Sequence, residues 1–282
     1  MKKAGMFALL FLIMLSSSSA SENWEIVSLD LRRAVPNNSA TPERLSPLHE
    51  LVPLSNDEGV IRRVKLPEGV VKAVAFTFDM CELDTTTTGC DMAVMSFLRE
   101  RGIPATLFMG GKWMRTHSRR VKEIMSEAEL FEIGNHNWSH GNCALLSDEG
   151  LRAQVLWTQA EYELLREEAG ADDIPEVPRL FRLPYGRNNE RSLKILAGLG
   201  MRVIQWDVAA EAGDNSNPKR AKRSAKIVAG MTKPGSILLF HANLVPKGTV
   251  NLLREVVSIL EDDGYEFVKV SELLEIRNQR TC

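Results

Sequence analysis

Residues 71–78 read VKAVAFTF, an apolar run rich in β-branched and aromatic residues. Such a run is typical of a strand that is buried on both faces, as in a parallel sheet. Residues 91–101 follow, with Met92, Met95 and Leu98 at helical spacing and Gly102 as a stop signal. A buried strand followed by a helix is the repeating unit of α/β folds.

The same alternation continues toward the C-terminus. We expect further strands at residues 105–109, 130–135, 179–183, 201–208, 235–240 and 265–268. We expect further helices at residues 118–128, 148–169, 189–199, 219–231 and 250–262. About seven such units predict a distorted (β/α) barrel with about seven parallel strands. An open, doubly wound sheet is the alternative, although no GxGxxG motif follows the first strand.

The chain divides into four segments. Residues 1–20 have a basic start, a short apolar run and small residues before Ala20, which predicts a signal peptide. Residues 21–70 are rich in proline and predict an extended N-terminal arm with short strand-like pieces such as residues 60–64. Residues 71–276 form the predicted α/β domain, and residues 277–282 form a C-terminal tail.

Composition and charge limit the possible partners. The chain has 282 residues, 44% hydrophobic and 26% charged, with a net charge of −2. Removal of residues 1–20 takes away two lysines and no acid, which leaves −4. We therefore expect no nucleic-acid partner and no stable membrane insertion after signal removal. The expected location is the periplasm or the extracellular space.

Four cysteines are present, at positions 81, 90, 143 and 282. An oxidising compartment permits disulfides, so we expect at least one among Cys81, Cys90 and Cys143. Buried free thiols are the alternative.

Two histidines follow the third predicted strand, in the sequence HNWSH at residues 136–140. Their spacing can place both imidazoles on one side of a tight turn or a first helical turn. Two such rings with an oxygen ligand and an open position can hold a catalytic divalent metal.

Other ionisable residues stand where predicted strands end. Asp79 follows the first strand, Arg182 belongs to the fourth, and His241 follows the sixth. Asp207 and Asp214 come after the fifth. Because a barrel gathers the carboxyl ends of its strands at one face, these side chains are expected to form one site with the histidines.

These motifs resemble the polysaccharide deacetylases with a NodB homology domain, carbohydrate esterase family four. The resemblance covers residues 71–276 and rests on TFD at 77–79, HNWSH at 136–140, RLPYG at 182–186 and LLFH at 238–241. It implies a distorted barrel of about seven strands. It also implies metal-dependent removal of acetyl groups from a sugar polymer.

The resemblance assigns roles residue by residue. Asp79 would be the general base, His136 and His140 metal ligands, and Arg182 the partner of Asp79. The backbone N–H of Tyr185 would help stabilise the oxyanion, and His241 would be the general acid. Leu239 would line the acetyl pocket, with Trp206 and Pro184 as further substrate-binding residues.

Two departures from the family pattern concern this site. The family usually has a second aspartate as third metal ligand, where this chain has Met80. Glu82, Asp84 and Cys81 are nearby replacements, and we favour Glu82 because of its longer side chain. A site with two histidines and extra water, or an inactive one, is the alternative. The Asp-x-x-Asp-Trp pattern after the fifth strand is also absent, so Asp214, and after it Asp207, is the expected partner of His241.

The preferred function is removal of N-acetyl groups from a cell-envelope or extracellular polysaccharide, with an acetylated glycan as substrate. The cofactor would be a divalent metal, with zinc as first choice and cobalt or nickel as alternatives. A glycan-binding homologue with a defective metal site, and a C–N hydrolase acting on a non-sugar amide, are the alternatives.

Overall fold

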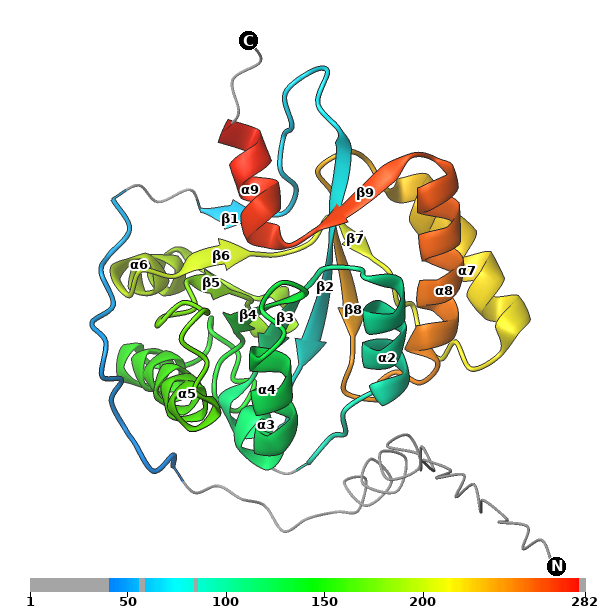
Figure 1. Ribbon diagram of the computed structural model, residues 1–282. Helices are drawn as coiled ribbons and strands as arrows, with labels where there is room; N and C mark the ends of the chain where they lie inside the picture. Colours follow the sequence, from blue (N-terminus) through cyan, green and yellow to red (C-terminus); the bar gives the residue numbers. More distant parts are fainter. Residues whose placement is uncertain (1–40, 56–58, 84–85, 279–282) are drawn as a thin grey trace, which may run out of the picture.

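The computed structural model describes residues 41–55, 59–83 and 86–278 (Figure 1). The predicted signal peptide, the first part of the predicted arm, Asp84 and Cys282 lie outside the described residues.

One mostly parallel sheet forms the centre of the molecule. Its strands are β1 (Val60–Ile61), β2 (Lys72–Met80), β3 (Ala105–Met109), β4 (Phe131–Asn135), β5 (Leu180–Phe181), β6 (Arg202–Ile204), β7 (Val208–Ala209), β8 (Ile237–His241) and β9 (Tyr265–Val268). The order is β1-β6-β5-β4-β3-β2-β8-β7, and β9 pairs with β2. All of these strand pairs are parallel, which confirms the predicted distorted barrel.

The predicted strand at residues 201–208 is two strands in the structure. The N–H of Gln205 donates to the carbonyl of Ile61 at 2.7 Å, whereas the N–H of Asp207 donates to the carbonyl of Ile237 at 3.3 Å. Between these two residues the chain crosses from the β1 side of the sheet to β8. The local pattern continued through this crossing, so the sequence alone did not predict the break.

Residues 60–64 close the gap that this crossing leaves. Beyond β1, Arg63 forms an antiparallel bridge with Ser236, and the N–H of Val64 donates to the carbonyl of Gly235 at 2.8 Å. Gly235 has φ +83°, and a Cβ there would lie 1.8 Å from the oxygen of Val64. Only glycine permits this close approach.

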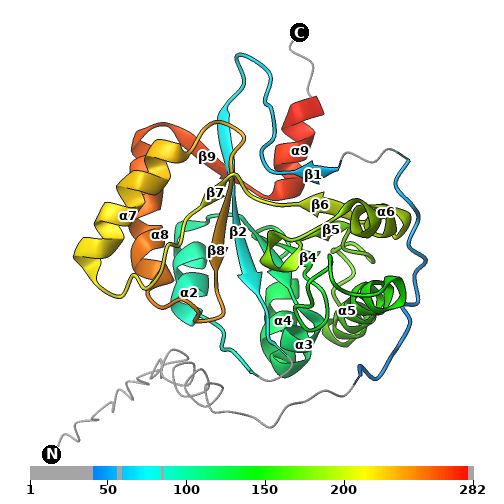
Figure 2. The same cartoon turned by 180° about the vertical axis from the view of Figure 1, so that it is seen from behind.

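Helices cover the outside of the sheet (Figure 2). They are α2 (Met92–Arg101), α3 (Gly111–Thr116), α4 (Ser118–Met125), α5 (Asp148–Ala169), α6 (Glu190–Gly198), α7 (Pro218–Met231), α8 (Thr249–Asp262) and α9 (Val270–Asn278), with the short 3-10 helix η1 (Pro184–Gly186). Asp91 caps α2 and Ser147 caps α5, where each side chain accepts a backbone hydrogen bond. Gly102 ends α2 in the left-handed conformation, as expected.

Side chains of β2 alternate between two hydrophobic clusters. Phe76, Phe78 and Met80 belong to the cluster between the sheet and the helices. Ala73 and Ala75 belong to a second cluster, to which α9 contributes Val270, Leu273 and Leu274. In Figure 1 the arrow of β2 points away from α9, so α9 closes the amino end of the barrel and leaves the carboxyl ends for a site.

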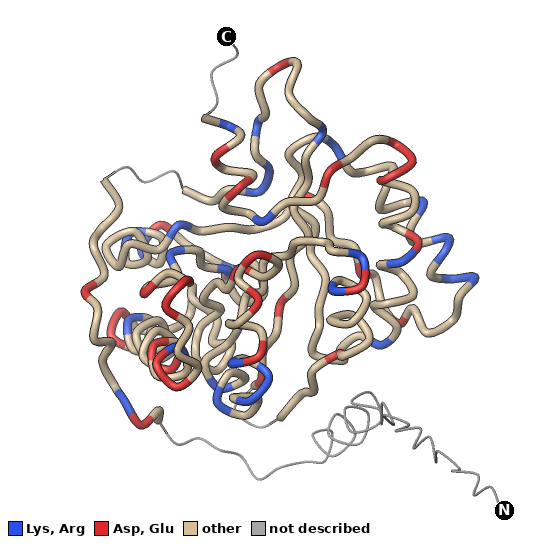
Figure 3. The backbone as a smooth tube through the Cα atoms, in the orientation of Figure 1, with Lys and Arg blue, Asp and Glu red and all other residues tan. Residues whose placement is uncertain are grey.

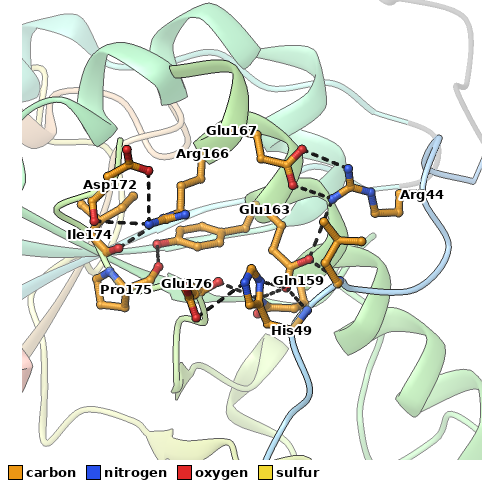
Figure 4. A network of polar contacts seen from close by, with 12 residues as sticks. Arg44, His49, Gln159, Glu163, Arg166, Glu167, Asp172, Ile174, Pro175 and Glu176 are labelled. Atoms are coloured by element: carbon orange, nitrogen blue, oxygen red, sulfur yellow. Dashed lines mark hydrogen bonds and ion pairs between the residues drawn. The ribbon is translucent and has the colours of Figure 1, made fainter. Parts of the chain in front are cut away.

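Residues 41–55 have no helix or strand and run along α5 as an extended segment. The guanidinium of Arg44 makes two hydrogen bonds with Glu167, at 3.0 and 3.1 Å. The buried carboxylate of Glu163 accepts from the backbone N–H groups of Leu48 and His49 (Figure 4). These contacts attach the segment to the domain.

Charges of both signs are mixed over the described part of the molecule (Figure 3). A basic face on α7 is made of exposed residues: Lys219, Arg220, Lys222, Arg223 and Lys226. No helix within the described ranges is long and apolar enough to cross a membrane.

Candidate active site

The predicted site residues gather at the carboxyl ends of the strands. Asp79 at the end of β2 and His241 at the end of β8 are direct register partners in neighbouring strands. A separate cavity of about 570 Å³ opens at the other edge of the sheet, beside Phe131 and Leu180 at the starts of β4 and β5. None of the predicted site residues lines that cavity.

Asp79 is held by a fully buried arginine. Nη1 of Arg182 donates to Oδ1 of Asp79 at 3.0 Å, Nη2 donates to the hydroxyl of Thr77 at 2.9 Å, and Nε donates to the carbonyl of Ile204 at 2.8 Å. Arg182 is 0% exposed and Asp79 is 4% exposed. Because each charge would be unpaired without the other, the pair holds the carboxyl group of Asp79 in one orientation.

The histidine pair lies in a turn after β4 and not on a helix. Asn137 and His140 both have positive φ, +64° and +57°, which makes the turn tight. The carboxamide oxygen of Gln154, on α5, accepts from the backbone N–H groups of Trp138 and Ser139. The rings of His136 and His140 consequently approach edge to face, with centroids 4.9 Å apart.

Burial favours the neutral form of both imidazoles. Nδ1 of His136 lies 2.8 Å from the carbonyl of Arg182, which makes Nδ1 the donor and leaves Nε2 with a free lone pair, 3.5 Å from Oδ2 of Asp79. Burial lowers the pKa of His136, and burial followed by the neighbouring His136 lowers the pKa of His140 to about 3. Nε2 of His136 and Nδ1 of His140 have no hydrogen-bond partner within the described residues.

Cys81, and not Glu82, is the residue that the fold brings to these rings. One ligand atom from each of Cys81, His136 and His140 lies within 4.8 Å of the others. The carboxylate of Glu82 instead accepts from the N–H of Thr88 at 3.2 Å and the hydroxyl of Thr116 at 2.9 Å. The prediction of Glu82 as third ligand was therefore wrong.

The reason is the alternation of side chains past the end of β2. Met80 points into the core under the helices, and Glu82 points the same way, toward α3. Asp79 and Cys81 occupy the alternate positions that face the histidines. Two neutral imidazoles and a thiol are a donor set that suits zinc and related divalent metals.

Glu211, and not Asp214 or Asp207, contacts His241. Its Oε2 lies 2.9 Å from Nδ1 of His241 and accepts from the backbone N–H of the same residue at 2.8 Å. Asp214 is exposed and accepts from the N–H of Ser216, so its selection as partner was wrong. Asp207 is bonded to Ser236 and Ile237 at the start of β8.

The carboxylate of Glu211 is buried, and Thr249 donates to its other oxygen. Burial by itself lowers the pKa of His241, but the hydrogen bond to Glu211 and the charges of Asp79 and Glu211 outweigh it and raise the pKa above its ordinary value. The sequence signal for this contact is an acidic residue shortly after the strand at residues 208–209. The family pattern has aspartates in this region, so it does not indicate Glu211.

The predicted substrate-binding residues surround the same place. Tyr185, in η1, has φ +58° and contacts His140 through its ring at 4.4 Å between centroids. A bulky residue in this region costs roughly 1–2 kcal/mol and is typical of functional sites. The ring of Trp206 lies over the guanidinium of Arg182 at 5.4 Å, and Leu239 lies two residues before His241 on β8. Pro184, the residue before Tyr185, is buried.

The cysteines of the described residues form no disulfide. Cys81, Cys90 and Cys143 are all free thiols, so the expected disulfide among them is wrong. Each has a separate environment: Cys90 contacts the sulfur of Met92, whereas Cys143 accepts from the amide of Asn137. Closeness in sequence did not bring their side chains together.

Comparison with known proteins gives a consistent family. A model of the polysaccharide deacetylase family matches residues 68–204, which include Asp79, His136, His140 and Arg182. A peptidoglycan-N-acetylglucosamine deacetylase of Bacillus cereus is 30% identical over 208 residues, which cover 73% of this chain and 90% of the relative.

The peptidoglycan-N-acetylglucosamine deacetylase PgdA of Listeria monocytogenes is 29% identical over 74% of this chain, but the match spans only 41% of that relative's length. The solved structure of the peptidoglycan deacetylase PdaC of Bacillus subtilis superposes with a TM-score of 0.59 at 27% identity, over 74% of this chain and 93% of that one. The match to nearly the whole Bacillus cereus relative, together with the shared fold, shows that this chain belongs to the polysaccharide deacetylase family.

Proposed function

We propose that this protein is a metal-dependent hydrolase that removes N-acetyl groups from a cell-envelope or extracellular polysaccharide. The observation that carries the proposal is the position of Asp79 and His241, which are register partners on β2 and β8, next to the neutral histidine pair. A base and an acid beside a metal-type donor set are the parts that hydrolysis of an amide requires.

Asp79 acts as the general base. Its carboxylate keeps one oxygen on Arg182 and directs the other toward His136, at 3.5 Å from Nε2. The oxygen that Arg182 leaves unbonded can accept a proton from the attacking water. The three hydrogen bonds of Arg182 hold this orientation before substrate arrives.

His136 and His140 would hold the metal. Each has an imidazole nitrogen without a hydrogen-bond partner among the described residues, which favours metal coordination. A divalent cation at such a site polarises a carbonyl group and makes water more acidic. Zinc is the first choice for this donor set, with cobalt and nickel as alternatives.

His241 acts as the general acid that protonates the leaving amine. The raised pKa of His241 favours the protonated imidazole, and its hydrogen bond to Glu211 fixes the ring so that Nε2 is directed away from Glu211. Tyr185 would supply a backbone N–H to the developing oxyanion, a contact worth on the order of 3 kcal/mol. Leu239, Trp206 and Pro184 would form the walls around the acetyl group.

We infer that the substrate is an acetylated glycan outside the cytoplasm. The relatives from Bacillus cereus and Listeria monocytogenes are named as peptidoglycan-N-acetylglucosamine deacetylases. The signal-peptide pattern of residues 1–20 supports export to the periplasm or the extracellular space.

Acetate release from peptidoglycan fragments and from chitin oligosaccharides tests the proposal. We expect release to stop with a chelator, to return with zinc, and to fall by about 10²–10⁴-fold in Asp79→Asn, because a general base contributes that much. Asp172→Asn, at an exposed position just after the C-terminal end of α5, is the matched control and should leave the rate unchanged. Acetate release that is indifferent to chelator and to Asp79→Asn would refute the proposal.

The loss of a carboxylate ligand at Met80 favours one rival, a protein that binds glycan without hydrolysing it. That function predicts glycan binding with no stoichiometric metal and no acetate. Metal analysis of the purified protein, together with the acetate assay, separates the two.

A further inference from the structure

The chain has Met80 where the family resemblance implies a carboxylate ligand, but its strand register places the thiol of Cys81 beside the histidines. Met80 is 0% exposed and belongs to the core between β2 and the helices, so it cannot turn toward the site without leaving a cavity there. The next residue, Cys81, has the opposite direction and joins His136 and His140 within 4.8 Å.

The backbone at Cys81 is held in place from two sides. Its carbonyl accepts from the hydroxyl of Thr88 at 2.8 Å and from the amide of Asn243 at 3.2 Å. The same amide lies 3.8 Å from the sulfur. Because Asn243 follows β8 closely, the thiol is positioned by the strand that also carries His241.

We propose that the sulfur of Cys81 is the third protein ligand of the metal site, completing a Cys-His-His set. This inference rests on the proposed function in one respect: it assumes that the site holds a metal ion. A thiolate carries the same single negative charge as the carboxylate that Met80 replaces. Three protein ligands leave a fourth position open, as catalytic zinc sites do.

The geometry requires little movement. In a tetrahedral zinc site with one sulfur and two nitrogens, the ligand atoms lie about 3.3–3.6 Å from one another. The three atoms here are within 4.8 Å, so each pair must approach by at most roughly 1.5 Å. Side-chain rotation alone covers this distance. Nε2 of the fully buried His136 has no hydrogen-bond partner among the described residues, which leaves its lone pair available.

The sulfur makes the site softer than a carboxylate would. Thiolate ligands favour zinc and its close substitutes, whereas carboxylates also suit harder ions such as magnesium and manganese. We therefore expect tight binding of zinc or cobalt and weak binding of magnesium. The thiolate also gives cobalt a spectroscopic signature that imidazole and carboxylate ligands lack.

Cobalt titration of the metal-free, reduced full chain under anaerobic conditions tests the assignment. Wild type should bind one equivalent with a near-ultraviolet sulfur-to-cobalt charge-transfer band. Cys81→Ala should lose the band and bind at least about 100-fold more weakly, because even indirect support of a ligand is worth 10–100-fold. Cys81→Asp should bind cobalt without the band, which also shows that a changed position 81 still folds.

Cys90→Ala is the matched control, because this thiol is buried against Met92 on the helix side of the sheet. It should keep the band. Stoichiometric cobalt without the band in wild type, or a band that survives Cys81→Ala, overturns the ligand assignment. Chelator-sensitive acetate release would then leave the proposed function standing. A wild-type protein that binds no cobalt overturns both the ligand and the metal-dependent mechanism.

Discussion

The contact between Glu211 and His241 leads to a sharp prediction about pH. Glu211→Gln removes the negative charge but preserves the shape of the side chain. The amide oxygen can still accept from the ring and the backbone N–H of His241, and the amide NH₂ can donate to the hydroxyl of Thr249. The change therefore isolates the charge of Glu211.

The magnitude follows from the kind of hydrogen bond that is lost. A hydrogen bond to a charged group contributes about 1.5–3 kcal/mol, whereas a neutral one contributes about 0.5–1.5 kcal/mol. The difference of roughly 1–1.5 kcal/mol corresponds to about one pKa unit. Because Glu211 helps to raise the pKa of His241, its replacement should lower that pKa by about this amount.

The sign is determined by the role of the residue. A general acid must be protonated, so its activity is present below its pKa and is lost as pH rises through it. In Glu211→Gln the alkaline limb of kcat/KM for acetate release should move to lower pH by about one unit. Asp214→Asn changes an exposed carboxylate that accepts from the N–H of Ser216 and does not contact His241, so it should leave the limb in place. An unmoved limb in Glu211→Gln, or an equal shift in Asp214→Asn, would refute the reasoning.

Three further predictions concern stability. Arg182→Met leaves the buried carboxylate of Asp79 unpaired and should lower the free energy of unfolding by about 3–5 kcal/mol. Denaturant titration measures this, and a loss no larger than that caused by breaking an exposed ion pair would contradict the prediction. Gly235→Ala should strongly destabilise the barrel in thermal melts, because its Cβ would lie 1.8 Å from a backbone oxygen. The control Gly230→Ala has open space around it on α7 and should be neutral or stabilising by up to about 1 kcal/mol. Glu163→Ala removes the acceptor of two backbone N–H groups of the extended segment, so limited proteolysis should cut within residues 41–55 faster than in wild type while the rest of the domain stays intact.

Much of the fold could be predicted from local patterns. Every strand expected from residue 71 onward exists, because buried parallel strands leave continuous apolar runs and helices leave apolar residues at their own spacing. The caps at Asp91 and Ser147 and the stop at Gly102 are also local features, set within one turn of the chain. The break at residues 205–207 is not local, since it depends on which neighbouring strand each N–H finds.

The positions of Asp79, His136, Arg182 and His241 were likewise predictable, because parallel strands bring their carboxyl ends to one face. Their contacts were not. Glu82 and Asp214 have suitable chemistry and suitable places in the sequence, yet both carboxylates are bonded elsewhere.

The sequence by itself determined the order of strands and helices and the set of ionisable groups at one end of the barrel, since hydrophobic periodicity and strand ends are properties of short segments. Only the tertiary structure decided that Cys81 faces the histidines and that Glu211 reaches His241. The physical reason is that both residues lie just past the end of a strand. There the direction of a side chain depends on how far the alternation continues and on what the neighbouring loops leave open.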